Sequence, residues 1–414
     1  MIEKLGKYYN VISGFAFKSS DLKDNADIPI IKIGNISNGR NVIIENMQYV
    51  DHEFLNINEK YHIKNGDVLI SLTGSHINQP NSMVGRVCRN YDKQTYLLNQ
   101  RAGKIIAKEN ASTDYMFYAL LTKAMKESIV SRAYGAANQV NVSPSAIMGI
   151  KWNFPTLPTQ QKIASILTSY DRLIENNTRR IRLLEQMAEN LYKEWFVRFR
   201  FPGHEKVEME NGLPKGWRAI HIKELAQLKS GYAFKSEWFI EEGEAVAKIK
   251  DIGNILMDTS SFSYVDKENC IKAKKFLLTT GDLTIALTGA TIGKISIVPK
   301  HKGNIYTNQR LGKFFLGDKP MEKLPFLYCL FKQESMVSNI VNLSNSSSAQ
   351  PNISPEQIEK IKILGNHDII SMYNKTCNPL FSNILALYSQ NQLLTRQRDL
   401  LLPRLMSGKL EVKS

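Results

Sequence analysis

The chain has 414 residues, 43% of them hydrophobic and 22% charged, a composition typical of folded domains that excludes a largely disordered protein. This length is enough for two domains, and no apolar run approaches the roughly 18–20 residues of a membrane span. The net charge of +15 is shared by both halves of the chain, which is expected if both face a polyanion, although solubility alone would also explain it.

The four cysteines are scattered and show no CxxC spacing, which indicates reduced thiols in a cytoplasmic protein rather than a disulfide framework or a zinc site. They are Cys88, Cys270, Cys329 and Cys377. The seven histidines also lack the spacing of metal ligands, and the N-terminal sequence has no apolar signal-peptide core. We therefore expect no metal site and no membrane insertion.

The first predicted domain, residues 1–155, alternates short β-branched runs with turns that contain Gly, Asn and Asp. Residues 28–33 and 68–72 are predicted to be buried strands, each followed by a Gly-containing turn. A helical stretch follows near residues 114–126. This mixture predicts an α+β globule.

A long helix is predicted from Thr159 to Phe196, because this stretch contains no Gly or Pro and follows Pro158. Its heptad core positions are apolar at seven of ten places, which favours a coiled-coil seam. The predicted seam consists of Ile163, Ile166, Tyr170, Leu173, Asn177, Arg180, Leu184, Met187, Leu191 and Glu194.

A linker rich in Pro, Gly and charge, residues 201–216, marks a domain boundary, and the chain then repeats phrases of its first half in the same order. The repeated pairs are Ser13–Ser19 with Ser230–Ser236, Ile33–Ile36 with Ile252–Ile255, Gly66–Ser75 with Gly281–Ala290, Asn99–Arg101 with Asn308–Arg310, and Ser143–Pro144 with Ser354–Pro355. Strands are predicted again at residues 245–249 and 283–287, and a helix near 324–340. So long a repeat predicts two similar domains rather than a solenoid.

A second long helix is predicted near the C-terminus, with Pro403 expected to kink or end it. Its predicted seam is Leu380, Ile384, Leu387, Asn391, Leu394, Arg398, Leu401 and Leu405. Each apolar stripe needs a partner, and we expect the two helices to pack on each other and to hold the domains apart. Asn177 and Asn391 lie on the two seams, where they either fix the register or remain solvated at the edge.

The order and duplication of these phrases resemble, over essentially the whole chain, the DNA-specificity subunit of type I restriction-modification enzymes. The stretches that carry the resemblance are Ser13–Ser19, Leu98–Arg101, Leu157–Ile163, Glu194–Phe199, Gly281–Lys294 and Leu401–Gly408. One departure is visible, since the second half reads Ile363-Leu364-Gly365-Asn366-His367-Asp368 where the first has Leu-Pro-Thr-Gln-Gln. The start of the second helix is therefore not defined by that motif.

The resemblance implies two target-recognition domains, residues 1–155 and 201–365, separated by helical spacers, residues 156–200 and 366–414. The fold class is then α+β, with two similar mixed α/β domains and two long helices packed as an antiparallel coiled coil. Each domain is expected to read one half of a bipartite, asymmetric target in double-stranded DNA. The helices are expected to dock two modification (methyltransferase) subunits, with restriction subunits joining for cleavage. The expected docking and spacer residues are Leu173, Leu184, Leu191, Trp195, Phe196, Leu387, Leu394 and Leu401.

Catalytic motifs are missing from the sequence, which agrees with a non-catalytic subunit. No Pro-Pro occurs, so the loop of an adenine methyltransferase is absent. The segment Gly289–Ile295 has three residues between its glycines and lacks Ser or Thr after Lys294, so it is not a Walker A motif. We expect S-adenosylmethionine, ATP and Mg²⁺ on partner subunits and no cofactor on this chain.

DNA readout is then expected from loops, because Gly allows close backbone approach and small polar or basic side chains reach phosphates and base edges. In the first half the candidates are Lys18, Lys32, Asn35, Thr73, Gly74, Ser75, His76, Asn78, Asn138 and Gln139. In the second half they are Lys235, Lys250, Thr288, Gly289, Thr291, Lys294, Ser347 and Gln350.

Alternatives stay open for each of these groups. If they do not contact DNA, the glycine loops are ordinary β-turns and the stretch 342–352 is a flexible polar linker. The two Phe-Lys-Ser lysines are then solvated. The repeated Asn-Gln-Arg is either a DNA contact or a structural turn with a buried Arg. For the whole chain, the alternative is a duplicated-domain adaptor that binds proteins rather than DNA.

Overall fold

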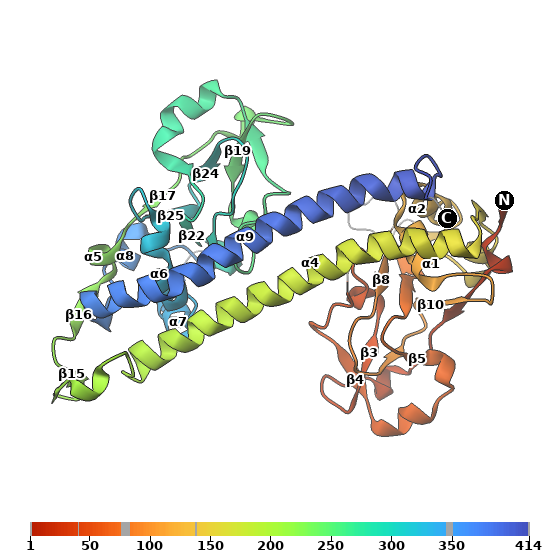
Figure 1. Ribbon diagram of the computed structural model, residues 1–414, viewed down its shortest axis with the longest axis horizontal. Helices are drawn as coiled ribbons and strands as arrows, with labels where there is room; N and C mark the ends of the chain where they lie inside the picture. Colours follow the sequence, from red (N-terminus) through yellow and green to blue (C-terminus); the bar gives the residue numbers. More distant parts are fainter. Residues whose placement is uncertain (1, 40, 76–82, 137–138, 345–350, 413–414) are drawn as a thin grey trace. The chain divides into compact units, whose positions relative to one another are not determined.

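The computed structural model describes residues 2–39, 41–75, 83–136, 139–344 and 351–412. They form two compact units (Figure 1). Unit 1 contains Met1–Leu173 and Leu394–Ser414, and unit 2 contains Ile174–Leu393. The division falls within both long helices, so each unit contains a globule and a segment of each helix.

Two four-stranded sheets form the globule of unit 1. The first has the order β2 (Tyr9–Ser13), β10 (Ala102–Ala107), β6 (Val68–Ser71), β8 (Val87–Arg89) and is antiparallel throughout. The second has the order β4 (Gln48–Val50), β3 (Ile28–Ile31), β9 (Tyr96–Leu98), β5 (His62–Ile63), with β3 and β9 parallel. A short pair, β1 (Ile2–Lys4) with β13 (Lys151–Asn153), joins the ends of the globule.

The first sheet of unit 1 is covered on both faces. Val68 and Ile70 share a core with α1 (Thr113–Leu121) and the long helices, whereas Leu69 packs with residues of the second sheet. This double coverage explains why β6 is buried at all four positions and begins with three consecutive apolar residues, Val68–Ile70. Strand β6 therefore leads directly from the middle of the unit to its surface loop.

Helices follow the strands in the same order in both units. The predicted helix 114–126 is two helices, α1 and α2 (Lys123–Val130), because Thr122 is extended and caps α2 through its hydroxyl. The short α3 (Pro144–Met148) begins at Ser143, whose hydroxyl accepts from the Ala146 N–H. The repeated Ser-Pro pair is thus an N-cap followed by a proline in the first turn.

Unit 2 repeats this topology. Its first sheet has the strand order β17 (Gln227–Ser230), β25 (Leu311–Phe315), β22 (Leu283–Ala286), β23 (Ile295–Ile297). Its second sheet has the strand order β18 (Phe239–Ile240), β20 (Ser263–Val265), β19 (Glu244–Ala247), β24 (Ile305–Thr307), β21 (Leu277–Leu278). The parallel pair is β19 with β24. The remaining strands are β14 (Met209–Glu210) with β15 (Leu213–Pro214), and β16 (Arg218–His221) with β26 (Lys362–Gly365). The helices are α5 (Ile222–Leu225), α6 (Leu324–Phe331), α7 (Glu334–Leu343) and α8 (Pro355–Glu359).

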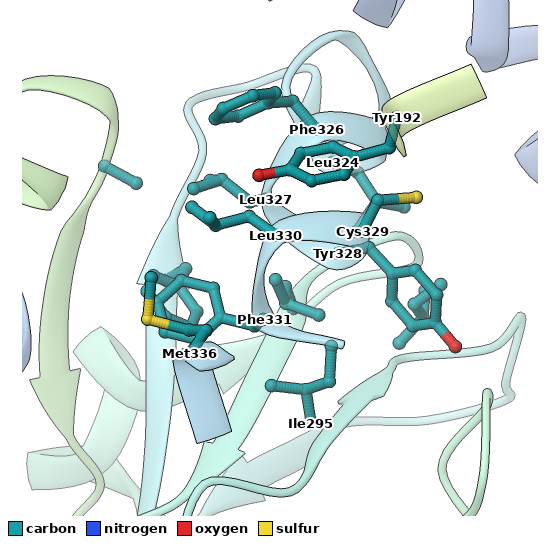
Figure 2. Close-up of a cluster of buried hydrophobic side chains, with 14 of the residues drawn as sticks. Tyr192, Ile295, Leu324, Phe326, Leu327, Tyr328, Cys329, Leu330, Phe331 and Met336 are labelled. Atoms are coloured by element: carbon teal, nitrogen blue, oxygen red, sulfur yellow. The ribbon is translucent and has the colours of Figure 1, made fainter. Parts of the chain in front are cut away.

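The core of unit 2 centres on α6, which is buried along its whole length. Figure 2 shows Tyr192 from the first long helix beside Phe326 and Leu327 of α6, with Ile295 from the sheet below. The rings of Tyr192 and Phe326 are 5.7 Å apart. Burial of these aromatic side chains is the main stabilising contribution to the unit.

The repeated Ser-Gly-aromatic phrase is explained by close backbone packing. A Cβ on Gly14 would lie 2.3 Å from the Leu98 carbonyl oxygen, and one on Gly231 would lie 2.3 Å from that of Thr307. The Gly14 N–H donates to the Ala102 carbonyl at 2.9 Å. In both units, therefore, only glycine fits where this segment crosses the end of the parallel strand.

One predicted correspondence between the halves is wrong. The matching hydrogen bonds are Asn99 N–H to Ile31 C=O and Asn308 N–H to Ala247 C=O, both 3.0 Å. They align Ile31 with Ala247, so the turn 33–35 corresponds to 249–251, not to 252–254. The Lys248 N–H donates to the Asp251 carboxylate just as the Lys32 N–H donates to Asn35. The two Ile-Gly-Asn-Ile sequences, Ile33–Ile36 and Ile252–Ile255, are therefore three residues out of register in the structural alignment of the units.

The first long helix, α4, spans Leu157–Tyr192 and continues as a π-helical turn, Lys193–Val197. At its start Gln160 is fully buried, and its side-chain oxygen accepts from the Ser112 N–H at 3.1 Å. Its amide group donates to the Pro155 carbonyl at 2.9 Å. The Leu-Pro-Thr-Gln-Gln phrase therefore ties the beginning of the helix to unit 1.

The second long helix, α9, spans His367–Met406. Asn366 replaces the missing motif as N-cap, since its side-chain oxygen accepts from the Asp368 N–H at 2.9 Å. Pro403 lies in the last turn and the helix ends three residues later, followed by Gly408 with φ +73°. Pro379 lies inside the helix and does not end it.

The seam predicted for α4 is wrong at three of its ten positions, Leu173, Arg180 and Met187, which are exposed. Leu173 and Met187 are 50% and 52% exposed, whereas Ile181 and Ala188 are buried. The contact face therefore follows Ile163, Leu167, Ile174, Asn177, Ile181, Leu184, Ala188 and Trp195. Adjacent apolar residues allowed either phase, and the structure uses the second of each pair. The seam predicted for α9 is buried or half-buried at all eight positions.

Asn177 and Asn391 fix the antiparallel pairing of the helices within unit 2. Asn177 is 5% exposed, and its Nδ2 donates to Asn391 Oδ1 and to Gln390 Oε1, both at 3.0 Å. Asn391 Nδ2 donates to the Ile174 carbonyl and the Thr178 hydroxyl, both at 3.2 Å. Both amides are bonded across the seam rather than solvated at its edge, which is the arrangement expected of a register-setting pair.

Candidate nucleic-acid interface

The two loops of unit 1 proposed as DNA contacts lie together. β7 (Thr73–Gly74) pairs with β12 (Gln139–Asn141), which pairs with β11 (Tyr134–Ala136), making a small three-stranded sheet. The Thr73 hydroxyl donates to Asn141 Oδ1 at 2.7 Å. No pattern in the sequence indicates that these two loops, more than sixty residues apart, form one surface.

The equivalent loops of unit 2 are also joined, with a different conformation. Thr288 forms an isolated bridge with Asn352, and the Gly289 N–H donates to the Pro351 carbonyl at 2.9 Å. Residues Gly289–Thr291 form a 3₁₀ turn, and Gly289 has φ +77°. The same framework thus presents a β-ribbon in unit 1 and a compact turn in unit 2.

Several predicted contacts serve the fold of these loops. A Cβ on Gly74 would lie 2.3 Å from the Val84 nitrogen, so glycine is required there for close packing. Thr73 is 5% exposed and already hydrogen-bonded. Thr288 and Thr291 are half-buried, whereas Gln139 and Lys294 are exposed and Ser75 is half-buried. His76, Asn78, Asn138, Ser347 and Gln350 lie outside the described residues.

The turns that follow β3 and β19 offer fewer side chains to DNA than predicted. Asn35 is 5% exposed, and its amide bonds to the Lys32 N–H and the Ile43 carbonyl, so it is not presented to a base. The ammonium of Lys32 donates to the Gln48 side chain. Lys250 is exposed, and its ammonium donates to the Ser261 carbonyl. These residues stabilise their own turns.

The two Phe-Lys-Ser lysines are both exposed but differ in their surroundings. Lys18 begins a 3₁₀ turn, and its N–H donates to the Asp21 carboxylate at 2.8 Å. The Lys235 ammonium lies 5.4 Å from the Trp238 ring centroid and 3.9 Å from the Glu237 carboxylate. Phe17 and Phe234 are buried, as expected for core rather than base-stacking residues.

The structure exposes a pair of side chains that the sequence reasoning left undecided. In the repeated Asn-Gln-Arg turns, Asn99 and Asn308 are buried and accept a backbone N–H, at 3.4 Å in both units. The following Gln and Arg are exposed in both units, so the structure rules out the alternative of a buried Arg and leaves that of a DNA contact. They are Gln100 and Arg101, and Gln309 and Arg310.

A second basic position was missed. The hydrogen bond from Ser71 N–H to Arg86 C=O in unit 1 corresponds to that from Ala286 N–H to Lys294 C=O in unit 2. Arg86 is therefore the counterpart of Lys294. The matching letters Val-Gly-Arg-Val and Ile-Gly-Lys-Ile would have identified it.

Not every repeated basic residue can contact DNA. Lys104 donates to the His62 carbonyl at 2.8 Å and lies 3.5 Å from the Asp67 carboxylate. Its counterpart Lys313 lies 2.6 Å from the carboxylate of Asp282, with side chains 11% and 3% exposed. These buried pairs explain the repeated Gly-Asp phrase as a structural element.

Two further findings limit the chemistry. Among the described residues, no three His, Cys, Asp or Glu side chains are grouped so that they could hold a metal ion. Searching those same residues, we found no helix with the length and apolarity needed to cross a membrane.

The residues predicted to dock partners divide into buried, half-buried and exposed groups. Trp195 and Phe196 are 5% and 8% exposed and belong to the core of unit 2, so no partner can contact them. Leu387 is also buried, and Leu184, Leu191, Leu394 and Leu401 are half-buried. Of the predicted set, only Leu173 is fully exposed.

Comparison with known proteins gives consistent results. The model of the type I restriction modification DNA specificity domain matches residues 2–186 and 214–364. The MjaIX type I restriction enzyme specificity subunit of Methanocaldococcus jannaschii is 26% identical, over 97% of this chain and 91% of the relative. The HindI specificity subunit of Haemophilus influenzae is 25% identical, over 72% and 77% respectively. The crystal structure of a type I restriction-modification S subunit from M. genitalium has the same fold, with a TM-score of 0.59 at 17% identity, covering 100% of this chain and 96% of that one.

Proposed function

The chain belongs to the type I restriction-modification DNA specificity family, and we propose that it reads a bipartite, asymmetric target in double-stranded DNA, one half with each unit. Its role is recognition and not catalysis, and its relatives are named specificity subunits. The family match leaves the protein-binding adaptor without support.

The observation that carries the proposal is a shared framework with different loops. The sheets, the glycine contact and the buried Lys–Asp pair recur in both units. The surface built on the end of β6 is a three-stranded ribbon, whereas that on β22 is a 3₁₀ turn. Different loops on one framework are suited to two different half-sites, because base readout depends on the side chains presented to the groove.

The long helices are proposed to set the spacer between the half-sites and to dock two modification subunits, with restriction subunits joining for cleavage. Exposed apolar side chains on both helices support docking, since helices of a folded protein ordinarily bury such residues. They are Leu173, Leu183, Met187, Leu393 and Leu400. S-adenosylmethionine, ATP and Mg²⁺ are assigned to those partners and none to this chain. We place the complex in the cytoplasm, because its proposed ligand is DNA.

Exchange of one recognition domain tests this proposal. Residues 1–155 are replaced by the corresponding residues of another family member, and the methylated sites are mapped with the same modification subunits. The expected result is a target changed in one half and unchanged in the other. A change in both halves would contradict the assignment of one half-site to each unit. As a control, exchange of residues 217–362 must change the opposite half.

A further inference from the structure

The Gln-Arg pair in the turn after each parallel strand takes part in the fold through its backbone and not through its side chains, as far as the described residues show. Asn99 and Asn308 are explained by their hydrogen bonds to the turn backbone. The side chains of Gln100 and Arg101 are exposed, as are those of Gln309 and Arg310. Among the described residues, none of the four side chains has a hydrogen-bond or ion-pair partner. Folding therefore does not account for their repetition.

Each turn lies directly beside the candidate DNA loops. The Leu72 N–H donates to the Arg101 carbonyl at 3.0 Å, and Leu72 precedes Thr73. In unit 2 the Leu287 N–H donates to the Arg310 carbonyl, also at 3.0 Å, and Leu287 precedes Thr288. The backbone position of the Arg relative to the loop is the same in both units, although the loops differ.

Repetition at this position indicates which part of DNA is contacted. Two unlike half-sites have different bases but the same phosphodiester backbone. A side chain that reads bases is expected to differ between the units, as the loops do, whereas one that contacts phosphate can be identical. Arg forms short, charge-assisted hydrogen bonds with phosphate oxygens, and a Gln amide can donate to them.

We propose that Arg101 and Arg310, each assisted by the preceding Gln, are equivalent phosphate anchors that hold the two units on DNA in the same orientation, independent of sequence. This inference rests on the proposed function and assigns positioning residues within that interface. The loops beside each turn then supply the base contacts. Lys104 and Lys313 also recur in the two units, but they are excluded because each is paired with an Asp of its own unit and is mostly buried.

The test measures the salt dependence of binding by the full chain in complex with its modification subunits. Two labelled duplexes are used, one with the target and one with both half-sites scrambled. Each phosphate contact adds about 0.9 to the slope of log affinity against log salt. Arg101→Ala and Arg310→Ala are each expected to lower that slope by about 1, and the double variant by about 2. At about 50 mM salt a single variant is expected to bind on the order of tenfold more weakly than wild type. By about 200 mM salt this difference in affinity is expected to be about 3.5-fold smaller.

Matched controls come from the opposite end of the same strands. Lys93 precedes β9 and Lys302 precedes β24, and both are exposed. Lys93→Ala and Lys302→Ala remove the same charge and are expected to leave the slope at the wild-type value. Arg101→Lys is expected to restore most of the slope, because it keeps the positive charge. Unchanged thermal unfolding shows that the variants remain folded.

Two outcomes would overturn the inference. If Arg101→Ala and Arg310→Ala have the same salt-dependence slope as Lys93→Ala and Lys302→Ala, the two Arg side chains do not contact phosphate. A loss of affinity for the target duplex alone would show that the Arg reads a base. If the wild-type complex itself binds both duplexes equally, or independently of salt, the proposed function fails instead, and the two failures are thereby separated.

Discussion

The Asn177–Asn391 contact gives the sharpest stability prediction. Asn177→Ala removes two donated hydrogen bonds, to Asn391 and to Gln390, and leaves their side-chain oxygens without that donor. Each bond contributes about 1 kcal/mol, and a buried group left unpaired costs somewhat more, so the free energy of unfolding is expected to fall by about 2–3 kcal/mol. The direct bond between the two residues is expected to give a coupling energy of about 1 kcal/mol in a double-mutant cycle.

Urea unfolding followed by tryptophan fluorescence measures this loss, because Trp195 and Trp217 are buried in the core of unit 2. The cycle comprises Asn177→Ala, Asn391→Ala and the double variant. Asn383→Ala, on the exposed face of α9, is the control and is expected to change stability by less than about 0.5 kcal/mol. A coupling energy below about 0.3 kcal/mol would refute the argument that this contact fixes the seam. Replacement of both residues by Leu is expected to recover most of the stability, since an apolar pair removes the unpaired amides.

Three further predictions follow from buried groups. Gly14→Ala is expected to lower the unfolding free energy by about 2–4 kcal/mol, because its Cβ would clash with a carbonyl oxygen. Gly34→Ala has open space around its Cβ and is expected to be neutral, and thermal unfolding distinguishes the two variants. Lys313→Met is expected to cost about 3 kcal/mol, since it leaves the buried Asp282 carboxylate without its cation; equal stability in urea would contradict this. Burial raises the pKa of the Cys88 thiol to about 12, so iodoacetamide at about pH 8 is expected to alkylate it only after unfolding, as mass spectrometry would show.

The strands and the duplication could be predicted because they are recorded in short-range patterns. β6 and β22 are buried at all four positions, so each is a mostly apolar run, with a glycine three residues after its end. The turns around Asn99 and Asn308 have the same letters because they form the same hydrogen bonds. These features depend on neighbouring residues and survive in the sequence.

The phase of α4 and the register of one repeat could not be predicted. Leu173 and Met187 each have an apolar neighbour, Ile174 and Ala188, so periodicity alone permits two faces, and packing selects the second. The Ile-Gly-Asn-Ile match is a coincidence of letters, and only the hydrogen bond at Ala247 reveals the true alignment. Tertiary contacts decide both cases.

The candidate interface was only partly predictable. The loops were identified, but their assembly depends on a two-residue strand, β7, which is too short to leave a pattern. The exposure of Arg101 and Arg310 depends on the orientation of a turn, which the repeated letters do not specify. Side-chain exposure distinguishes two kinds of repeated residue. Those that are buried, such as the Lys–Asp pairs, serve the fold, and those that are exposed are available to a ligand.

Recognition of two unlike half-sites, one by each unit, can be tested on methylated DNA. The chain is co-expressed with its modification subunits, and methylated bases are mapped across the host genome by long-read sequencing. The expected result is one split motif, with unlike halves at a fixed separation and methylation on both strands. Methylation at an unsplit motif, or none despite a stable complex, would contradict it.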